Sequence, residues 1–258
     1  MKGLRKLRLR QICFVAHDLE KTLDQFCDLL QAEVCFRDSG IGHFGLVNGL
    51  IEVGGDFLEV VSPTEEGTTA GRYLDRMKGD SGYMLIFQCE NAQIYREKAE
   101  ELNIRQVWTT NLENGVIATH FHPKDIGGVI MSVDSMSNEK WKNKYSYWQW
   151  AGTDWMTGKV NDSFAIIGAE MSCVSPDELS RKWSSFLKLP LSKKNQHGVI
   201  KGEDFEIRFS KDSDKGLTYL SEIDIKIKDE DIKEEIISKY GISGNLTLKL
   251  CGTKINLL

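Results

Sequence analysis

The stretch Leu9-Arg-Gln-Ile-Cys-Phe-Val-Ala-His-Asp-Leu-Glu20 sets the pattern on which the fold of this chain depends. Its first part, Leu9–Ala16, is a mostly apolar run of the length that buried strands have. Asp18 then offers a helix N-cap, and apolar residues follow at helical spacing from Leu19 to Leu30. A strand that leads directly into a capped helix predicts the start of a β-α unit.

Further predicted strands follow this stretch, and the same order of strands and helix then recurs along the chain. Three strand candidates follow the helix, separated by turns rich in Gly, Asp and Ser, at Glu33–Arg37, Phe44–Val53 and Asp56–Val61. The order β-α-β-β-β recurs between Tyr83 and Val133, and two less regular copies follow between Phe164 and Leu257. This repetition predicts an α+β protein of four βαβββ units, which we name repeats 1 to 4.

The composition is that of a soluble globular protein. The chain has 258 residues, of which 41% are hydrophobic and 28% charged, and its net charge is −5. This balance lacks the concentrated basic surface that nucleic-acid binding requires. The apolar run Ile12–Ala16 is too short to span a bilayer or to form the core of a signal peptide. The basic segment Lys2–Arg10 is interpreted as a surface arm, with contact to an acidic partner as the alternative.

The number and spacing of the cysteines indicate the redox state of the cellular compartment in which the protein is expected. The sequence has six scattered cysteines and no C-x-x-C pair: Cys13, Cys27, Cys35, Cys89, Cys173 and Cys251. Several lie among apolar neighbours, where a free cysteine behaves as a small hydrophobe. A reduced, cytoplasmic protein is therefore expected.

A tryptophan-rich segment separates two patterned regions. It has little strand or helix periodicity and carries Trp141, Trp148, Trp150 and Trp155. The sequence is therefore divided into a first domain at 1–136, a connector at 137–158 and a second domain at 159–258. The connector indoles are expected to pack on a domain face, with an aromatic lid over a ligand as the alternative.

Three stretches carry a resemblance to a known superfamily. They are Gln11-Ile-Cys-Phe-Val-Ala-His-Asp-Leu-Glu20, Asp56-Phe-Leu-Glu-Val-Val-Ser-Pro63 and Phe121-His-Pro-Lys-Asp-Ile-Gly-Gly-Val129. With the order of units, they resemble the vicinal oxygen chelate superfamily of glyoxalases, bleomycin-resistance proteins and dioxygenases. The third stretch is also similar to methylmalonyl-CoA epimerases. The resemblance implies two tandem domains, each a curled mixed sheet with helices outside and a ligand cup inside. For residues 160–258 only the order of elements supports it.

The resemblance also implies a divalent metal held by side chains of the first and fourth strands. The four ligand positions in the first half fall on Gln11, Glu59, Met84 and Ser132. Methionine and serine are poor ligands for the hard or borderline divalent ions of this superfamily. Because catalytic sites usually need about three protein ligands, the metal site is expected to be degenerate. If a divalent metal does bind, the remaining candidate ligands are Gln11, Glu59 and His120.

The second half offers carboxylates at related places. Glu206 falls at the fourth-strand position and Glu222 lies near the position in the next unit, without a histidine.

Glu59 and His120 are the candidate catalytic residues. Strand alternation places Glu59 on one face with Phe57 and Val61, where a buried carboxylate would have a raised pKa and could carry protons. The alternative is a structural ion pair with an arginine. His120 is expected to line the cup as an acid, a base or a substrate contact.

Five residues are candidates for binding a substrate: Gln11, His43, Arg72, Tyr83 and His122. His43 lies in a glycine-rich turn, so a surface position is its alternative. His122 precedes a proline, so a structural hydrogen bond is its alternative. Arg72 and Tyr83 could hold an anionic group, and the alternative for Arg72 is a salt bridge to Asp75 or Glu65.

These features support three hypotheses. The first is an enzyme, a lyase, isomerase or hydrolase-like protein, acting on a small compound with adjacent oxygens in the first-half cup. The second is a metal-free binding protein that sequesters an antibiotic or a metabolite. The third is that the second half is mainly structural and closes the cup of the first. The expected partner is a small molecule, with no nucleic acid or membrane, and the expected state is a monomer or homodimer.

Overall fold

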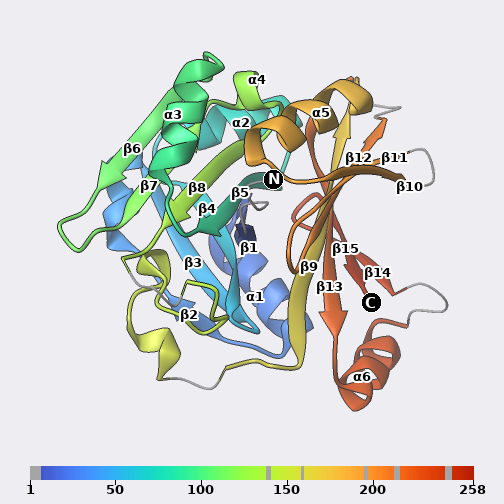
Figure 1. Cartoon of the computed structure of the whole chain (residues 1–258). Coiled ribbons are helices and arrows are strands. Elements are labelled where there is room, and N and C mark those ends of the chain that lie inside the picture. Colours follow the sequence, from blue (N-terminus) through green and yellow to red (C-terminus); the bar gives the residue numbers. More distant parts are fainter. Residues whose placement is uncertain (1–6, 138–140, 158–159, 195–196, 212–215, 242–245) are drawn as a thin grey trace. The chain divides into compact units, whose positions relative to one another are not determined.

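The computed structural model describes residues 7–137, 141–157, 160–194, 197–211, 216–241 and 246–258 (Figure 1). Helices and strands alternate along the whole of this range, so the predicted α+β class is confirmed.

Repeats 1 and 2 both have the predicted order. Repeat 1 contains β1 (Leu7–Val15), α1 (Leu19–Leu30), β2 (Val34–Phe36), the 3-10 helix η1 (Ser39–Phe44), β3 (Leu46–Val53) and β4 (Asp56–Pro63). Helix α2 (Thr69–Met77) leads to repeat 2. Repeat 2 contains β5 (Ser81–Cys89), α3 (Gln93–Glu101), β6 (Gln106–Asn111), β7 (Ile117–Phe121), α4 (Pro123–Ile126) and β8 (Ile130–Ser135).

Repeats 3 and 4 follow two short 3-10 helices, η2 (Gln149–Ala151) and η3 (Asp154–Met156). Repeat 3 contains β9 (Phe164–Cys173), α5 (Pro176–Leu187), β10 (Leu191–Lys194), β11 (His197–Lys201) and β12 (Glu206–Lys211). Repeat 4 contains β13 (Tyr219–Ile227), α6 (Glu230–Tyr240), β14 (Thr247–Leu250) and β15 (Thr253–Leu257). Within the described residues, repeat 4 therefore has two strands after its helix where the other repeats have three.

Hydrogen bonding arranges the strands in two mixed sheets. The eight-stranded sheet has the order β2-β3-β4-β1-β5-β8-β7-β6, and the seven-stranded sheet has the order β10-β11-β12-β9-β13-β15-β14. The first and last strands of a repeat are parallel neighbours, as in β1–β4 and β9–β12. Along the chain, the last strand of the eight-stranded sheet ends at Ser135 and the first strand of the seven-stranded sheet begins at Phe164. The domain limits at 136 and 158 stay a prediction.

The chain forms two compact units. Of the described residues, those within 7–10, 84–146 and 167–221 form compact unit 1, and those within 11–83, 147–166 and 222–258 form compact unit 2. Repeats 2 and 3 supply most of compact unit 1, and repeats 1 and 4 supply most of compact unit 2.

Helix α1 illustrates how the sequence dictates these elements. The side chain of Asp18 accepts a hydrogen bond from the backbone N–H of Lys21 at 3.1 Å, which confirms the predicted N-cap. Phe26 on the apolar face of the helix packs against Phe14 of β1, with ring centroids 4.9 Å apart. The helix thus covers one face of repeat 1 and leaves the opposite, inner face to other side chains.

The basic N-terminal segment differs from its prediction as a surface arm. Residues 2–6 lie outside the described residues, and β1 begins at Leu7. Arg8 and Arg10 are buried in compact unit 1. Arg8 donates to the backbone carbonyl of Asn143 at 3.0 Å, and Arg10 donates to that of Ser146 at 2.8 Å. Buried guanidinium groups are tolerated here because backbone oxygens of the connector accept their hydrogens.

Two further observations bear on the environment of the chain. All six cysteines are free. In the described part of the chain, no helix combines the length and apolar character needed to cross a membrane.

Candidate functional site

The inner face of repeat 1 is built from alternating residues of three neighbouring strands. The parallel pair β1–β4 sets Cys13 beside Glu59, and the antiparallel pair β3–β4 sets Asn48 beside Val61. Because successive strand residues point to opposite faces, Gln11, Cys13, Asn48 and Glu59 all point to the face away from α1.

Glu59 is the centre of a hydrogen-bonded cluster on this face and is 8% exposed. The amide nitrogen of Gln11 donates to Glu59 Oε2 at 2.8 Å, and that of Asn48 donates to Oε1 at 2.7 Å. The indole nitrogen of Trp148 donates to Gln11 Oε1 at 2.7 Å, and the backbone N–H of Asp38 donates to Asn48 Oδ1 at 2.8 Å. We name Gln11, Asn48, Glu59 and Trp148 the Glu59 cluster.

The indole N–H of Trp148 and the backbone N–H of Asp38 fix the direction of every side-chain amide hydrogen bond in the cluster. An indole nitrogen and a backbone N–H can only donate. The Gln11 oxygen must therefore face Trp148, and the Asn48 oxygen must face the backbone of Asp38. Both amide nitrogens are left to point at Glu59, so each carboxylate oxygen receives an amide hydrogen.

The electrostatics of Glu59 follow from this arrangement. Burial raises the pKa of Glu59, and hydrogen bonds from Asn48, Cys13 and Gln11 lower it in part. Burial also raises the pKa of Cys13 well above its usual value, so Cys13 stays a protonated donor. No arginine in the described residues forms an ion pair with Glu59, so the arginine-paired alternative does not hold there. A buried carboxylate held by neutral donors accepts a proton more readily than an exposed one.

The connector lies on the same inner face within compact unit 2. Trp148 is fully buried. Trp155 packs edge-on against Phe57, with ring centroids 5.0 Å apart. Gly152 lies so close to Phe36 that an added Cβ would be 2.6 Å from its ring. The prediction that connector indoles pack on a domain face is confirmed for these two tryptophans, and Trp148 is also part of the Glu59 cluster.

The Glu59 cluster does not offer a divalent metal a suitable donor set. A cation at either carboxylate oxygen would face the amide hydrogens of Gln11 and Asn48, and amide nitrogens are not ligands for these ions. Within the described residues, no group of three or more His, Cys, Asp or Glu side chains is placed to hold a metal ion. His120, the third candidate ligand, belongs to compact unit 1, whereas Gln11 and Glu59 belong to compact unit 2.

His120 lies on β7 and is half-buried. Its ring centroid is 4.5 Å from that of Trp108, and burial lowers its pKa to about 4. The imidazole is therefore neutral at pH 7, with one donating and one accepting nitrogen. Ser132 lies opposite His120 in the sheet and donates its hydroxyl to Asp134 at 2.6 Å. Met84 is buried on β5.

The other two candidate histidines hold local structure. His122 Nδ1 accepts from the backbone N–H of Lys124 at 3.0 Å and caps α4, so the structural hydrogen bond of the alternative is present. His43 is exposed in η1, where its ring lies 3.6 Å from that of Phe44 and its Nδ1 contacts the carbonyl of Gly40. Substrate contacts by either residue stay a prediction.

Arg72 and Tyr83 both lie in compact unit 2. Arg72 is exposed, donates to the carbonyl of Gly67 and lies 3.1 Å from the hydroxyl of Thr69, so it bonds to its own helix start. Tyr83 is buried and packs edge-on against Tyr73 at 5.2 Å, and burial raises the pKa of its hydroxyl. Neither described contact involves an anionic partner, and a role in holding a substrate stays a prediction.

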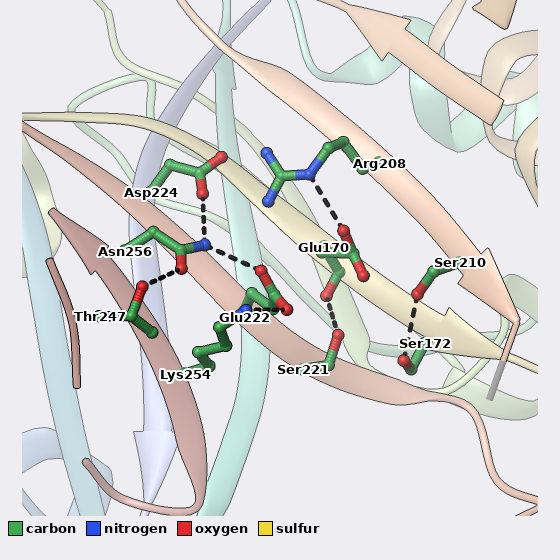
Figure 2. Close-up of polar contacts among 10 residues, drawn as sticks. All are labelled: Glu170, Ser172, Arg208, Ser210, Ser221, Glu222, Asp224, Thr247, Lys254 and Asn256. Carbon is green, nitrogen blue, oxygen red and sulfur yellow. Dashed lines mark hydrogen bonds and ion pairs between the residues drawn. The ribbon is translucent and has the colours of Figure 1, made fainter. Parts of the chain in front are cut away.

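The second-half carboxylates are paired inside the chain. Glu206 of β12 lies 3.2 Å from the ammonium group of Lys201. Glu222 of β13 lies 2.9 Å from the ammonium group of Lys254 and accepts from the amide of Asn256 at 2.8 Å (Figure 2). These carboxylates are neutralised or hydrogen-bonded by neighbouring strand residues.

Three residues around Glu59 were not among the candidates from sequence: Cys13, Asn48 and Trp148. Asn48 is a polar residue at an inward-facing place in an otherwise apolar strand, and alternation could have drawn attention to it. Trp148 lies 137 residues from its partner Gln11, and no local pattern indicates that pairing.

Comparison with known proteins gives structural matches only. No family model and no curated protein sequence matches the chain. A hypothetical protein from Staphylococcus aureus matches with a TM-score of 0.68 and 9% identity, over 98% of this chain and 99% of that one. A methylmalonyl-CoA epimerase from Streptomyces coelicolor matches with a TM-score of 0.45 and 19% identity, over 51% of this chain and 96% of that one. A methylmalonyl-CoA epimerase from Mycobacterium tuberculosis matches with a TM-score of 0.45 and 17% identity, over 55% of this chain and 96% of that one.

At these identities the matches concern the fold. The match to the Staphylococcus aureus protein spans both chains almost completely, so it covers all four repeats described above. The chain and the Staphylococcus aureus protein therefore share a fold, which in this chain has four repeats arranged in two mixed sheets.

Proposed function

We propose that the chain binds a small, oxygen-rich metabolite on the inner face of its first half and that Glu59 accepts a proton there without a metal. As an enzyme it would be a lyase or isomerase of the glyoxalase-like type. The observation that carries the proposal is a buried carboxylate with a raised pKa, held by neutral donors on both oxygens. General bases of this kind typically contribute about 10²–10⁴-fold to a rate.

The geometry assigns separate tasks to the residues around Glu59. Gln11 and Asn48 orient the carboxylate and stabilise its charged form, and Trp148 holds Gln11 in the required direction. A carboxylate has about four lone-pair directions and Glu59 has three donors, Gln11, Asn48 and Cys13, so one direction is left for a proton or a ligand hydroxyl. His120 stays a candidate acid or base on the inner face of repeat 2.

A second candidate function is metal-free binding and sequestering of a small molecule, as in antibiotic resistance. The fully buried Trp148 and the Trp155–Phe57 pair favour it, because aromatic walls with a few polar groups are typical of ligand sites. For either function we propose a cytoplasmic setting, which the six free cysteines support. A monomeric or homodimeric state is part of the same proposal.

A ligand screen followed by proton exchange tests the proposal. Hydroxy acids, oxo acids and diols are screened by thermal shift on the full chain, since a specific ligand raises the apparent stability. Hydroxy acids and oxo acids that bind are incubated in D₂O, and deuterium uptake at the carbon beside the carbonyl is followed by NMR. We expect uptake to fall by about 10²-fold or more in Glu59→Ala and to be unchanged in the exposed variant Glu97→Gln.

The same experiment separates the two candidate functions. Binding without deuterium uptake in the unmodified chain supports sequestering. Equal uptake in the unmodified chain, Glu59→Ala and His120→Ala contradicts a proton-transfer role for these residues.

A further inference from the structure

The inner face of repeat 2, in compact unit 1, carries a group of polar side chains that includes none of the Glu59 cluster residues. The strand register sets Gln88 of β5 beside Asp134 of β8, and Ser132 of β8 beside His120 of β7. Ser132 and Asp134 alternate on one strand, and their hydrogen bond shows that they share a face. Gln88 and His120 point to that same face through the register.

The opposite face of this repeat is covered by α3. Arg96 of that helix donates to the hydroxyl of Thr119, which precedes His120 on β7. The group formed by Gln88, His120, Ser132 and Asp134 therefore points away from α3.

Gln88 is the unusual member of this group. It is 0% exposed, and neither its amide oxygen nor its amide nitrogen has a hydrogen-bond partner among the described residues. Native proteins pair nearly all buried polar atoms, because an unpaired donor or acceptor bears the full loss of its hydration. An amide with both ends unpaired therefore points to a partner that is not part of the chain.

His120 offers a second set of unused groups beside it. In the described part of the chain, its ring makes the contact with Trp108 and no side-chain hydrogen bond. Its nitrogens are therefore one donor and one acceptor, and Trp108 forms an aromatic wall on one side. Ala118, which lies beside Asp134 in the register, puts only a small side chain on this face.

We propose that this face binds an uncharged ligand that carries an amide-like edge, a hydrogen-bond donor next to an acceptor. Such an edge pairs with both atoms of Gln88 at once, and a further polar group of the ligand reaches His120. The buried Asp134 disfavours an anion, and the two unpaired atoms of Gln88 need one donor and one acceptor, which a neutral amide-like edge supplies. Lactams, primary carboxamides and nucleobase edges share this chemistry. The proposal does not depend on the function of Glu59.

Three probes distinguish the sources of such an edge: 2-pyrrolidinone, nicotinamide and uracil. Each is titrated into the full chain by NMR, with cyclopentanone as the matched ring that lacks the N–H donor. We expect at least one probe to bind and cyclopentanone to bind at least about tenfold more weakly than 2-pyrrolidinone if the lactam is the one that binds. In Gln88→Leu the affinity for the binding probe falls about tenfold or more, and in the control Gln106→Leu it is unchanged. Absence of binding by all three, or equal binding by Gln88→Leu, overturns the proposal.

The Tm of the chain without ligand provides an independent test of the proposal. Because leucine fills a similar volume without unpaired polar atoms, Gln88→Leu is expected to raise the Tm by about 2–4 °C. A lower Tm would show that structural water already pairs the amide, and the proposal would then fail.

Discussion

Glu59→Gln and Gln11→Glu are each expected to lose about 1–3 kcal/mol of unfolding free energy at pH 7, and the double variant is expected to recover most of that loss. The reason is the fixed direction of the hydrogen bonds. Trp148 and the backbone of Asp38 can only donate, so the amides of Gln11 and Asn48 cannot turn round. An amide introduced at position 59 must set its own NH₂ group against one of theirs.

The exchange of the two groups restores every pairing. A carboxylate at position 11 accepts from Trp148 and from the new amide at position 59. The oxygen of that new amide accepts from Asn48. The double variant therefore keeps the number of donors and acceptors while moving the charge from β4 to β1, and it should still lose proton transfer at position 59.

The single variant Gln11→Glu should also respond to pH. Two adjacent carboxylates raise the pKa of the pair above that of the unfolded chain. Its stability relative to the unmodified chain is therefore greatest at low pH and is lost as pH rises through the raised folded pKa. Urea unfolding at several pH values measures all three variants, with Glu97→Gln as the exposed control. Additive losses in the double variant would contradict the assigned hydrogen-bond directions.

Trp148→Ala is expected to cost about 3–5 kcal/mol of unfolding free energy, because a fully buried indole leaves a large cavity. Trp148→Phe should cost less, because a six-membered ring still fills part of the site and the five-membered ring with its donor to Gln11 is lost. In Met156→Ala, at a 42% exposed connector residue, the change should stay within about 0.5 kcal/mol.

Urea unfolding of these connector variants checks that prediction. If Trp148→Ala were as stable as Met156→Ala, the connector would not be packed on the inner face of repeat 1. If Trp148→Phe were as unstable as Trp148→Ala, the hydrogen bond to Gln11 rather than ring burial would dominate.

Local patterns were sufficient to predict the repeats. Asp18, the apolar spacing after it and the turn residues between strands act within a few positions, and these are the interactions that define helices and strands. Strand alternation likewise placed Glu59 on an inner face, because it needs only the neighbouring residues.

The partners of Glu59 could not be predicted in the same way. Asn48 reaches it through the register of β3 and β4, and Trp148 reaches Gln11 from a connector without periodicity. The buried arginines Arg8 and Arg10 show the same limit, since carbonyl groups far along the chain make their burial tolerable. Such pairings depend on tertiary structure, and a single sequence does not encode them as a local pattern.

Metal content tests most directly the central claim that Glu59 works without a metal. The full chain is purified without chelators, dialysed against Zn²⁺, Ni²⁺, Mn²⁺ or Fe²⁺ in turn, and analysed by inductively coupled plasma mass spectrometry beside Glu59→Gln. Because amide hydrogens occupy both carboxylate oxygens, we expect far less than one equivalent of each metal and no difference between the two proteins. A stoichiometric metal that is lost in Glu59→Gln would contradict the account.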